Sequence, residues 1–273
     1  MKLFYVLTLA IWFACGGTLP QDQAMGVEGM DEREMAESDS LDVWSTDYIM
    51  GKFEPSVDTN FTLVDKMYAD REGLYLRKDT YRAFKSMYEK AHMKGIKLVI
   101  RSATRNFEYQ KEIWENKWNG TIPLESNVRG NTITDETIRA QEILKYSSMP
   151  GSSRHHWGTD LDLNAFNNAY FEHGKGREIY TWLQENAATF GFCQPYSSKD
   201  TGRPGYHEEK WHWSYIPIAN QLTKSAKLYL TDQMISGFLG AEQAPKLSIV
   251  QNYVMGIDTT CLIDTSQTIL ISN

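Results

Sequence analysis

The sequence predicts an α+β fold, with a small, mostly antiparallel sheet and helices flanking it. Short strand patterns stand between helix patterns in a mixed order, unlike the regular alternation of a doubly wound parallel sheet. Of the 273 residues, 41% are hydrophobic and 23% are charged, which are ordinary values for a globular protein with a buried core. This composition excludes a disordered, collagen-like or multi-span membrane protein.

Helices are predicted where apolar residues recur at helical spacing between capping residues. Gly95 and Gly191 each end a helix, Thr134 caps the start of one, and Pro217 begins another. The expected helices cover residues 76–94, 108–118, 134–146, 176–190 and 244–255, with a further one starting at residue 217.

Strands are predicted from short runs of β-branched, aromatic or alternating apolar residues. The expected strands cover residues 96–100, 161–163 and 209–216. The middle one, Leu161-Asp162-Leu163, alternates like a half-buried strand.

Charge is unevenly spread along the chain. The 28 basic and 35 acidic side chains give a net charge of −7. Residues 16–47 carry nine of the acids against Arg33 alone, which predicts an acidic, disordered tether. The remainder is close to neutral and has no basic surplus, so no nucleic-acid partner is expected.

The N-terminus has the pattern of an export signal. Lys2 precedes an almost continuous apolar run over residues 3–14, which suits a signal peptide and is too short to span a bilayer. The run ends in Ala14-Cys15, which resembles a bacterial lipoprotein cleavage site. Residues 1–15 are therefore expected to form a lipoprotein-type signal segment that is cleaved before Cys15, giving a periplasmic or cell-envelope protein lipid-anchored through Cys15. Ordinary secretion is the alternative.

Two further cysteines, Cys193 and Cys261, lie in the part of the chain expected to fold. An oxidising compartment would allow them to pair, but their spacing in the sequence does not give their distance in space. A disulfide and two free thiols both remain open.

Chemistry-bearing residues gather in two short segments, Ser153–Asp162 and Glu208–Trp213. Together these segments contain histidines and several carboxylates. Two imidazoles and one carboxylate form a three-ligand catalytic zinc site, with a fourth position for water. A nearby carboxylate that is not a ligand can then act as a general base. The predicted sheet and its flanking helices are therefore expected to surround a zinc site.

The first segment resembles the S-x-H-x-x-G-x-A-x-D signature of zinc D-Ala-D-Ala carboxypeptidases of the VanY and VanX type. Glu209-Lys210-Trp211-His212 matches that family's E-x-W-H motif. Upstream, Ser102-Ala103-Thr104-Arg105 followed by Gln110 is similar to its S-G-Y-R…Q segment, although two of the first four residues differ. The three motifs occur in the family's order over about residues 75–220.

This resemblance implies a role for each of seven residues. They are His155, Asp162 and His212 as zinc ligands, Glu209 as the catalytic base, Arg105 as a substrate or transition-state clamp, and Gln110 and Ser153 as substrate-binding residues.

Two neighbours of these residues leave alternatives open. Asp160 stands where the family has a small residue, and in a strand it projects to the same face as Asp162. The family spacing favours Asp162 as the ligand, so Asp160 is either an acceptor for an imidazole N–H or a solvated side chain. His156 competes with His155, but neighbours in an extended segment diverge, so one of them is expected to face the metal.

Glu209 and His212 are three residues apart and would face opposite sides of a regular strand. A shared site therefore requires a local irregularity over residues 209–212.

The predicted function is zinc-dependent removal of the C-terminal D-alanine from peptidoglycan stem peptides. L,D-carboxypeptidase and peptidoglycan endopeptidase activity on the same scaffold are alternatives, and a non-haem iron oxygenase or a non-catalytic zinc wall-binding module is disfavoured. Arg105 competes with Arg154, Arg203 and Lys210 for the substrate carboxylate. The peptidase domain is expected over residues 48–220, with a helical extension over residues 221–273 packed on the core.

Overall fold

The computed structural model describes residues 44–125 and 127–262. The predicted signal peptide and most of the predicted tether lie outside the described residues. The first described helix, α2 (Thr46–Ile49), begins within the last residues assigned to that tether. The Ser45 hydroxyl caps it by accepting a hydrogen bond from the Tyr48 amide. Every helix within the described ranges is too short or too polar to cross a membrane.

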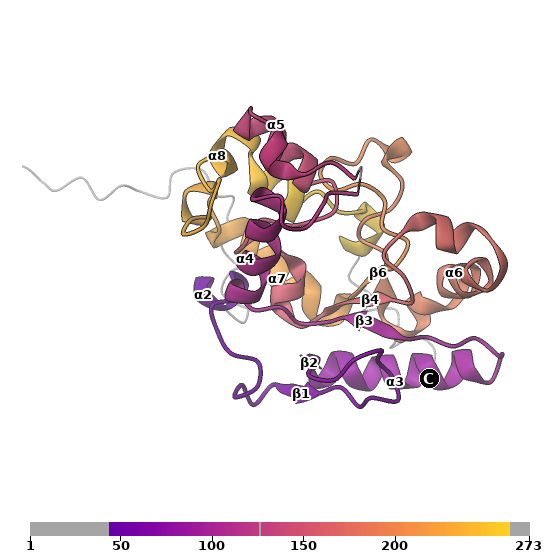
Figure 1. The fold of residues 1–273 in the computed structure, drawn as a ribbon. Coiled ribbons are helices and arrows are strands. Elements are labelled where there is room, and N and C mark those ends of the chain that lie inside the picture. Colours follow the sequence, from indigo (N-terminus) through magenta and orange to yellow (C-terminus); the bar gives the residue numbers. More distant parts are fainter. Residues whose placement is uncertain (1–43, 126, 263–273) are drawn as a thin grey trace, which may run out of the picture. The chain divides into compact units, whose positions relative to one another are not determined.

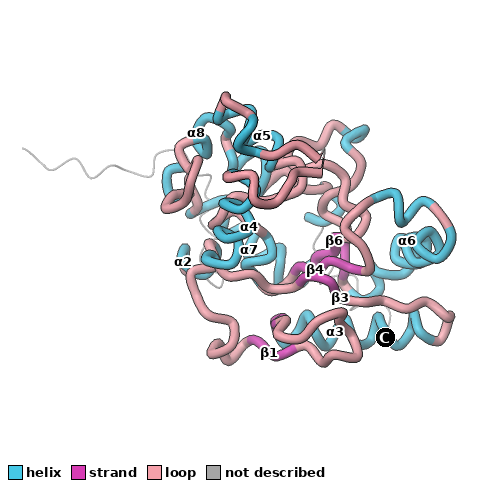
Figure 2. Tube along the Cα trace, viewed as in Figure 1, coloured by secondary structure: helices cyan, strands magenta, loops and turns pink. Residues whose placement is uncertain are grey.

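A four-stranded antiparallel sheet lies at the centre of the fold (Figures 1 and 2). Its strands are β3 (Ile100–Ser102), β4 (Asp160–Leu163), β5 (Phe192–Cys193) and β6 (His212–Tyr215), in the order β3-β4-β6-β5. A separate antiparallel pair is formed by β1 (Phe61–Leu63) and β2 (Tyr75–Arg77). The predicted class, a small and mostly antiparallel sheet with flanking helices, is confirmed.

One face of the sheet packs on α3 (Lys78–His92) and α6 (Gly174–Asn186). Leu161 and Leu163 of β4 share a buried cluster with Phe84 and Met87 of α3. Because side chains alternate along a strand, Asp160 and Asp162 point to the opposite face. All four residues of β4 are buried, so this strand is covered on both faces rather than half-buried as predicted.

A second core forms between α4 (Phe107–Trp118), α5 (Glu136–Ile143), α8 (Gln243–Leu247) and residues near the end of the described chain. The helix α7 (Ile216–Tyr229) joins this core through Ile216, whereas its Leu222 and Ala226 pack with Ile49 of α2. In this cluster Trp114 and Ile143 pack with Ile249 and Cys261. The Trp114 indole also donates a hydrogen bond to the carbonyl of Leu239 (2.8 Å). The C-terminal extension therefore lies on α4.

The predicted 96–100 strand and the predicted 134–146 helix are shorter in the structure because side chains compete for their backbone groups. The 96–100 strand begins only at Ile100, because the Asn164 side chain binds the backbone before it: its Oδ1 accepts from the Val99 amide (3.4 Å) and its Nδ2 donates to the Lys97 carbonyl (2.8 Å). The 134–146 helix begins at Glu136, capped by Asp135 instead of Thr134. The Asp135 carboxylate accepts hydrogen bonds from two amides of the first turn.

The predicted 244–255 helix is broken at Ser248, which has a positive φ of 49°. α8 ends at Leu247, and a π-helical turn follows over Val250–Val254. Contacts from outside the helix fix this break, because the Asp232 carboxylate accepts a hydrogen bond from the Val250 amide (2.7 Å).

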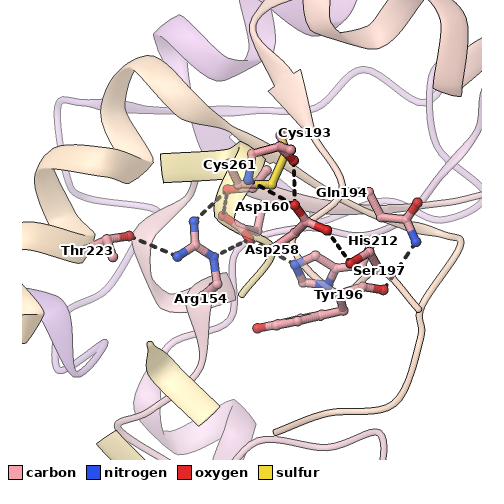
Figure 3. Close-up of a disulfide and its surroundings, with 12 residues drawn as sticks. Arg154, Asp160, Cys193, Gln194, Tyr196, Ser197, His212, Thr223, Asp258 and Cys261 are labelled. Carbon is pink, nitrogen blue, oxygen red and sulfur yellow. Dashed lines mark hydrogen bonds and ion pairs between the residues drawn. A yellow bond between two sulfur atoms is a disulfide. The ribbon is translucent and has the colours of Figure 1, made fainter. Parts of the chain in front are cut away.

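Cys193 and Cys261 form a disulfide, with their Cα atoms 5.6 Å apart (Figure 3). The bond joins β5 to the last described turn of the chain across 68 residues. It closes a long loop and so restricts the unfolded chain.

Replacing both cysteines with alanine should lower the free energy of unfolding by about 2–4 kcal/mol, because the unfolded chain regains the entropy of that loop. Urea denaturation of the oxidised protein and of the double variant measures the difference. A reductant should destabilise the wild type and leave the double variant unchanged. Equal midpoints for the two oxidised proteins would contradict a stabilising role.

Candidate metal centre

The structure brings three predicted ligand residues together from separate elements. His155 lies in the 3₁₀ turn Arg154–Trp157, Asp162 on β4 and His212 at the start of β6. The register of the sheet pairs Asp162 directly with His212. One ligand atom from each residue lies within 4.8 Å of the others, and all three residues are buried.

The distances within this group fit a single small cation. Nε2 of His155 lies 3.3 Å from Oδ2 of Asp162, and Nδ1 of His212 lies 3.1 Å from Oδ1 of Asp162. Ligands held about 2.1 Å from a tetrahedral zinc ion are about 3.4 Å apart. The two imidazole rings meet edge to face, with centroids 4.7 Å apart.

The hydrogen bonds of His155 leave its Nε2 available to bind a metal ion. Its Nδ1 donates to the carbonyl of Ala103 (2.9 Å), which fixes the tautomer. Among the described residues, Nε2 of His155 and Oδ1 of Asp162 are buried without a hydrogen-bond partner. Such unpaired buried atoms are costly unless something binds them. They are the atoms that face a common centre here.

The charges around the group also favour a cation. Burial, helped by the Arg105 guanidinium, lowers the pKa of His155 and keeps this imidazole neutral. Burial alone would lower the pKa of His212, but the neighbouring carboxylates of Asp160, Asp162 and Glu209 raise it well above the ordinary value. A proton and a metal ion therefore compete for Nδ1 of His212, so metal affinity should fall as the pH falls.

The two competing residues face elsewhere. Asp160 contacts Nε2 of His212 instead of joining the three ligand atoms. His156 accepts the Gly151 amide at Nε2 (3.0 Å) and donates from Nδ1 to the carbonyl of Arg105 (2.6 Å). Both of its nitrogens are therefore occupied, and burial lowers its pKa to about 3.

Glu209 reaches the group through a turn. Residues 209–211 precede the strand, which begins at His212, and the His212 amide donates to the carbonyl of Glu209 (3.2 Å). The predicted irregularity is confirmed, although the strand is shorter than expected. Oε2 of Glu209 lies 3.4 Å from Nδ1 of His212. Burial raises the pKa of Glu209, and His212 partly offsets this effect.

A cavity of about 300 Å³ opens beside these residues. Arg105 lines it together with His155, Asp162, Glu209 and His212. Lining residues that the motifs do not contain include Arg71, Tyr109, Lys117, Tyr146, Phe166 and Tyr196. They come from distant parts of the chain, and no local sequence pattern marks them.

Gln110 and Ser153 were expected to bind substrate, but neither lines the cavity. Gln110 is buried and donates to the carbonyl of Ser148, a lining residue (2.8 Å). Ser153 caps the turn that carries His155 by accepting the amide of that residue. In this structure both side chains support the walls of the site.

The other candidates for the substrate carboxylate are also occupied elsewhere. Arg154 is buried in a network with Asp160, and Arg203 donates to four backbone carbonyls. Nζ of Lys210 lies 3.6 Å from Oε1 of Glu172. None of the three lines the cavity, whereas Arg105 does.

A family model and a curated relative that match the chain carry the same description. The family model VanY, described as D-alanyl-D-alanine carboxypeptidase, matches residues 73–218, more than half of the chain. A D-alanyl-D-alanine carboxypeptidase of Enterococcus faecalis is 28% identical over 157 residues, which cover 58% of this chain and 53% of that protein. The chain thus spans about half the length of this enterococcal relative.

Two solved structures are similar to the chain as well. VanYB in complex with D-alanine-D-alanine has 23% identity over 64% of this chain and 87% of its own, with a TM-score of 0.45. The L,D-carboxypeptidase LdcB has 21% identity over 72% of this chain and 81% of its own, with a TM-score of 0.48.

Proposed function

Because the chain belongs to the VanY family of D-alanyl-D-alanine carboxypeptidases, we propose that it is a zinc-dependent hydrolase that removes the C-terminal D-alanine from peptidoglycan stem peptides. One observation carries the proposal. A buried His155–Asp162–His212 group lies beside Glu209, a buried carboxylate outside the ligand set, at the wall of a cavity. This is the arrangement that metal-assisted peptide hydrolysis requires.

His155, Asp162 and His212 would hold the zinc ion. When bound, zinc acidifies a water molecule and polarises the peptide carbonyl as a Lewis acid. The ligand residues are held from behind, because Ala103 accepts the free N–H of His155 and Asp160 contacts the second nitrogen of His212.

Glu209 accepts the proton of the attacking water and delivers it to the leaving amine. Its raised pKa suits a residue that must take up and release one proton. Arg105 extends into the same cavity, where its guanidinium can pair with the carboxylate of the terminal D-alanine or with the developing oxyanion. Gln110 and Ser153 position the cavity wall and the ligand turn.

Defined muropeptides distinguish this activity from the two related ones. We expect loss of one D-alanine from stems that end in D-Ala-D-Ala, detected by product mass. Cleavage only of tetrapeptide stems would identify an L,D-carboxypeptidase, and cleavage within the stem or crosslink would identify an endopeptidase. No hydrolysis of any stem by the zinc-loaded protein would overturn the proposal.

Metal analysis tests the ligand set independently of substrate. We expect about one zinc per chain, and a strong chelator should remove both the metal and the activity. His155→Ala should lose metal, because only two ligand residues remain. His92→Ala is the matched control, since His92 is exposed on α3, and it should keep both metal and activity. Full zinc content in His155→Ala would exclude this ligand set.

We also propose that residues 1–15 direct export and that Cys15 carries a lipid anchor. The apolar run and Ala14-Cys15 support this proposal. An exported protein would meet peptidoglycan, so the location agrees with the chemistry. Mass spectrometry of the mature N-terminus tests it: a lipidated Cys15 is expected, and an unmodified start downstream of Cys15 would refute the anchor.

A further inference from the structure

A buried hydrogen-bond network connects His212 of the candidate metal centre to Thr223 of α7 (Figure 3). Its central members are Arg154, Asp160 and His212. The side chains of Arg154 and Asp160 are fully buried and form an ion pair, with Nε of Arg154 3.1 Å from Oδ2 of Asp160. A fully buried pair of charges is costly to desolvate, so its position calls for a specific role.

Every acceptor site of Asp160 is used. Oδ1 accepts hydrogen bonds from the hydroxyls of Thr159 (2.7 Å) and Ser214 (2.8 Å). Oδ2 accepts from Nε of Arg154 and contacts Nε2 of His212 at 2.9 Å. A carboxylate beside a buried guanidinium is ionised and can only accept hydrogen bonds. Nε2 of His212 must therefore carry the proton in this contact.

Arg154 also has defined hydrogen-bond partners in this network. Arg154 donates to the hydroxyls of Thr223 (3.0 Å) and Ser214 (2.8 Å). The Thr223 hydroxyl donates a hydrogen bond to the carbonyl of Ala219, and the Ser214 hydroxyl donates one to Asp160. Both hydroxyls accept from the guanidinium and donate onward, so the direction of these hydrogen bonds is fixed and the Asp160 carboxylate is held in one orientation.

From this geometry we propose that Asp160, held by Arg154, is a positioning residue that fixes the ring orientation and tautomer of His212. With hydrogen on Nε2, the lone pair of Nδ1 faces Asp162, 3.1 Å away. Without Asp160 the ring could rotate or exchange its proton between the two nitrogens. A carboxylate that accepts the second N–H of a ligand histidine strengthens metal binding. The network thus joins the ligand to the turn before β4 and to α7.

This inference rests on the proposed zinc site but can fail separately from it. Asp160→Ala alone would leave Arg154 buried and unpaired, so the test uses Arg154→Met together with Asp160→Ala. The double variant removes both charges and places at 160 a small residue, as in the family pattern. The matched control is Arg77→Met, which removes another buried arginine without touching the metal ligands.

Zinc affinity is measured by competition with a chromophoric chelator. We expect the double variant to bind zinc about 10–100-fold more weakly, and Arg77→Met to bind it as the wild type does. Equal affinity in the double variant and the wild type would overturn the role of Asp160. A wild-type protein that binds no zinc would overturn the proposed function and this inference together.

A second measurement needs no variant, so it holds even if the double variant does not fold. Nitrogen-15 NMR of the zinc-loaded wild type distinguishes the protonated from the metal-bound nitrogen of His212. We expect hydrogen on Nε2 and metal on Nδ1. Metal on Nε2 would exclude the inferred contact with Asp160.

Discussion

Glu209→Gln should lower the rate of stem-peptide hydrolysis by about 10²–10⁴-fold while the protein keeps its zinc. Glutamine has nearly the same shape and can still hydrogen-bond to His212, but it cannot accept a proton from water. Glu209 is buried, and its position is set by backbone contacts, with its amide donating to the carbonyl of Tyr196 (2.9 Å). The substitution should therefore remove the base without moving the turn.

Release of D-alanine and metal content, measured on the same preparation, test this expectation. Glu208→Gln is the matched control, since it makes the same change one residue earlier, outside the cavity lining. It should retain nearly full activity. Hydrolysis by Glu209→Gln within a few fold of wild type would falsify its role as the base. Loss of zinc in that variant would instead make Glu209 a ligand.

The sequence was informative where chemistry depends on spacing within a short segment. The family motif pointed to His155 and Asp162, and the structure brings the two together from a strand and a 3₁₀ turn, where an extended segment was expected at His155. The three-residue spacing of Glu209 and His212 predicted a departure from regular strand geometry, and the structure has a turn there. In both cases local geometry decides which side chains can meet.

Features set by distant contacts could not be predicted in this way. The break at Ser248 depends on Asp232, and the pairing of Cys193 with Cys261 depends on how the chain end packs. From the sequence, Asp160 is either an acceptor for an imidazole N–H or a solvated side chain, and Arg154 is a candidate for binding the substrate carboxylate. Only the fold shows that the two are buried against each other.

The residues that line the cavity could not be predicted from the sequence motifs either. Gln110 and Ser153 stand at motif positions, yet the structure uses them to support Ser148 and the ligand turn. Lys117, which does line the cavity, bonds Glu125 and Ser147 from separate loops. A motif points to the proposed metal ligands, but the cavity lining depends on side chains that converge from many segments.

Arg105→Lys should lower kcat/KM for stem peptides ending in D-Ala-D-Ala by about 10²–10³-fold, the size expected for loss of one positioned charge donor. The backbone of Arg105 is fixed to the ligand turn. Its amide donates to the carbonyl of His155 (3.1 Å), and its own carbonyl accepts from His156 (2.6 Å). The side chain therefore enters the cavity from a rigid base.

Lysine keeps the positive charge, so this substitution isolates geometry from charge. A guanidinium can pair with a carboxylate through two parallel hydrogen bonds, whereas an ammonium acts as a point charge. Steady-state kinetics should show the loss with zinc content unchanged. Arg71→Lys makes the same exchange at an exposed residue of the cavity lining and should change kcat/KM far less. If Arg105→Lys is as active as Arg71→Lys, charge alone suffices at this position and the paired recognition is wrong.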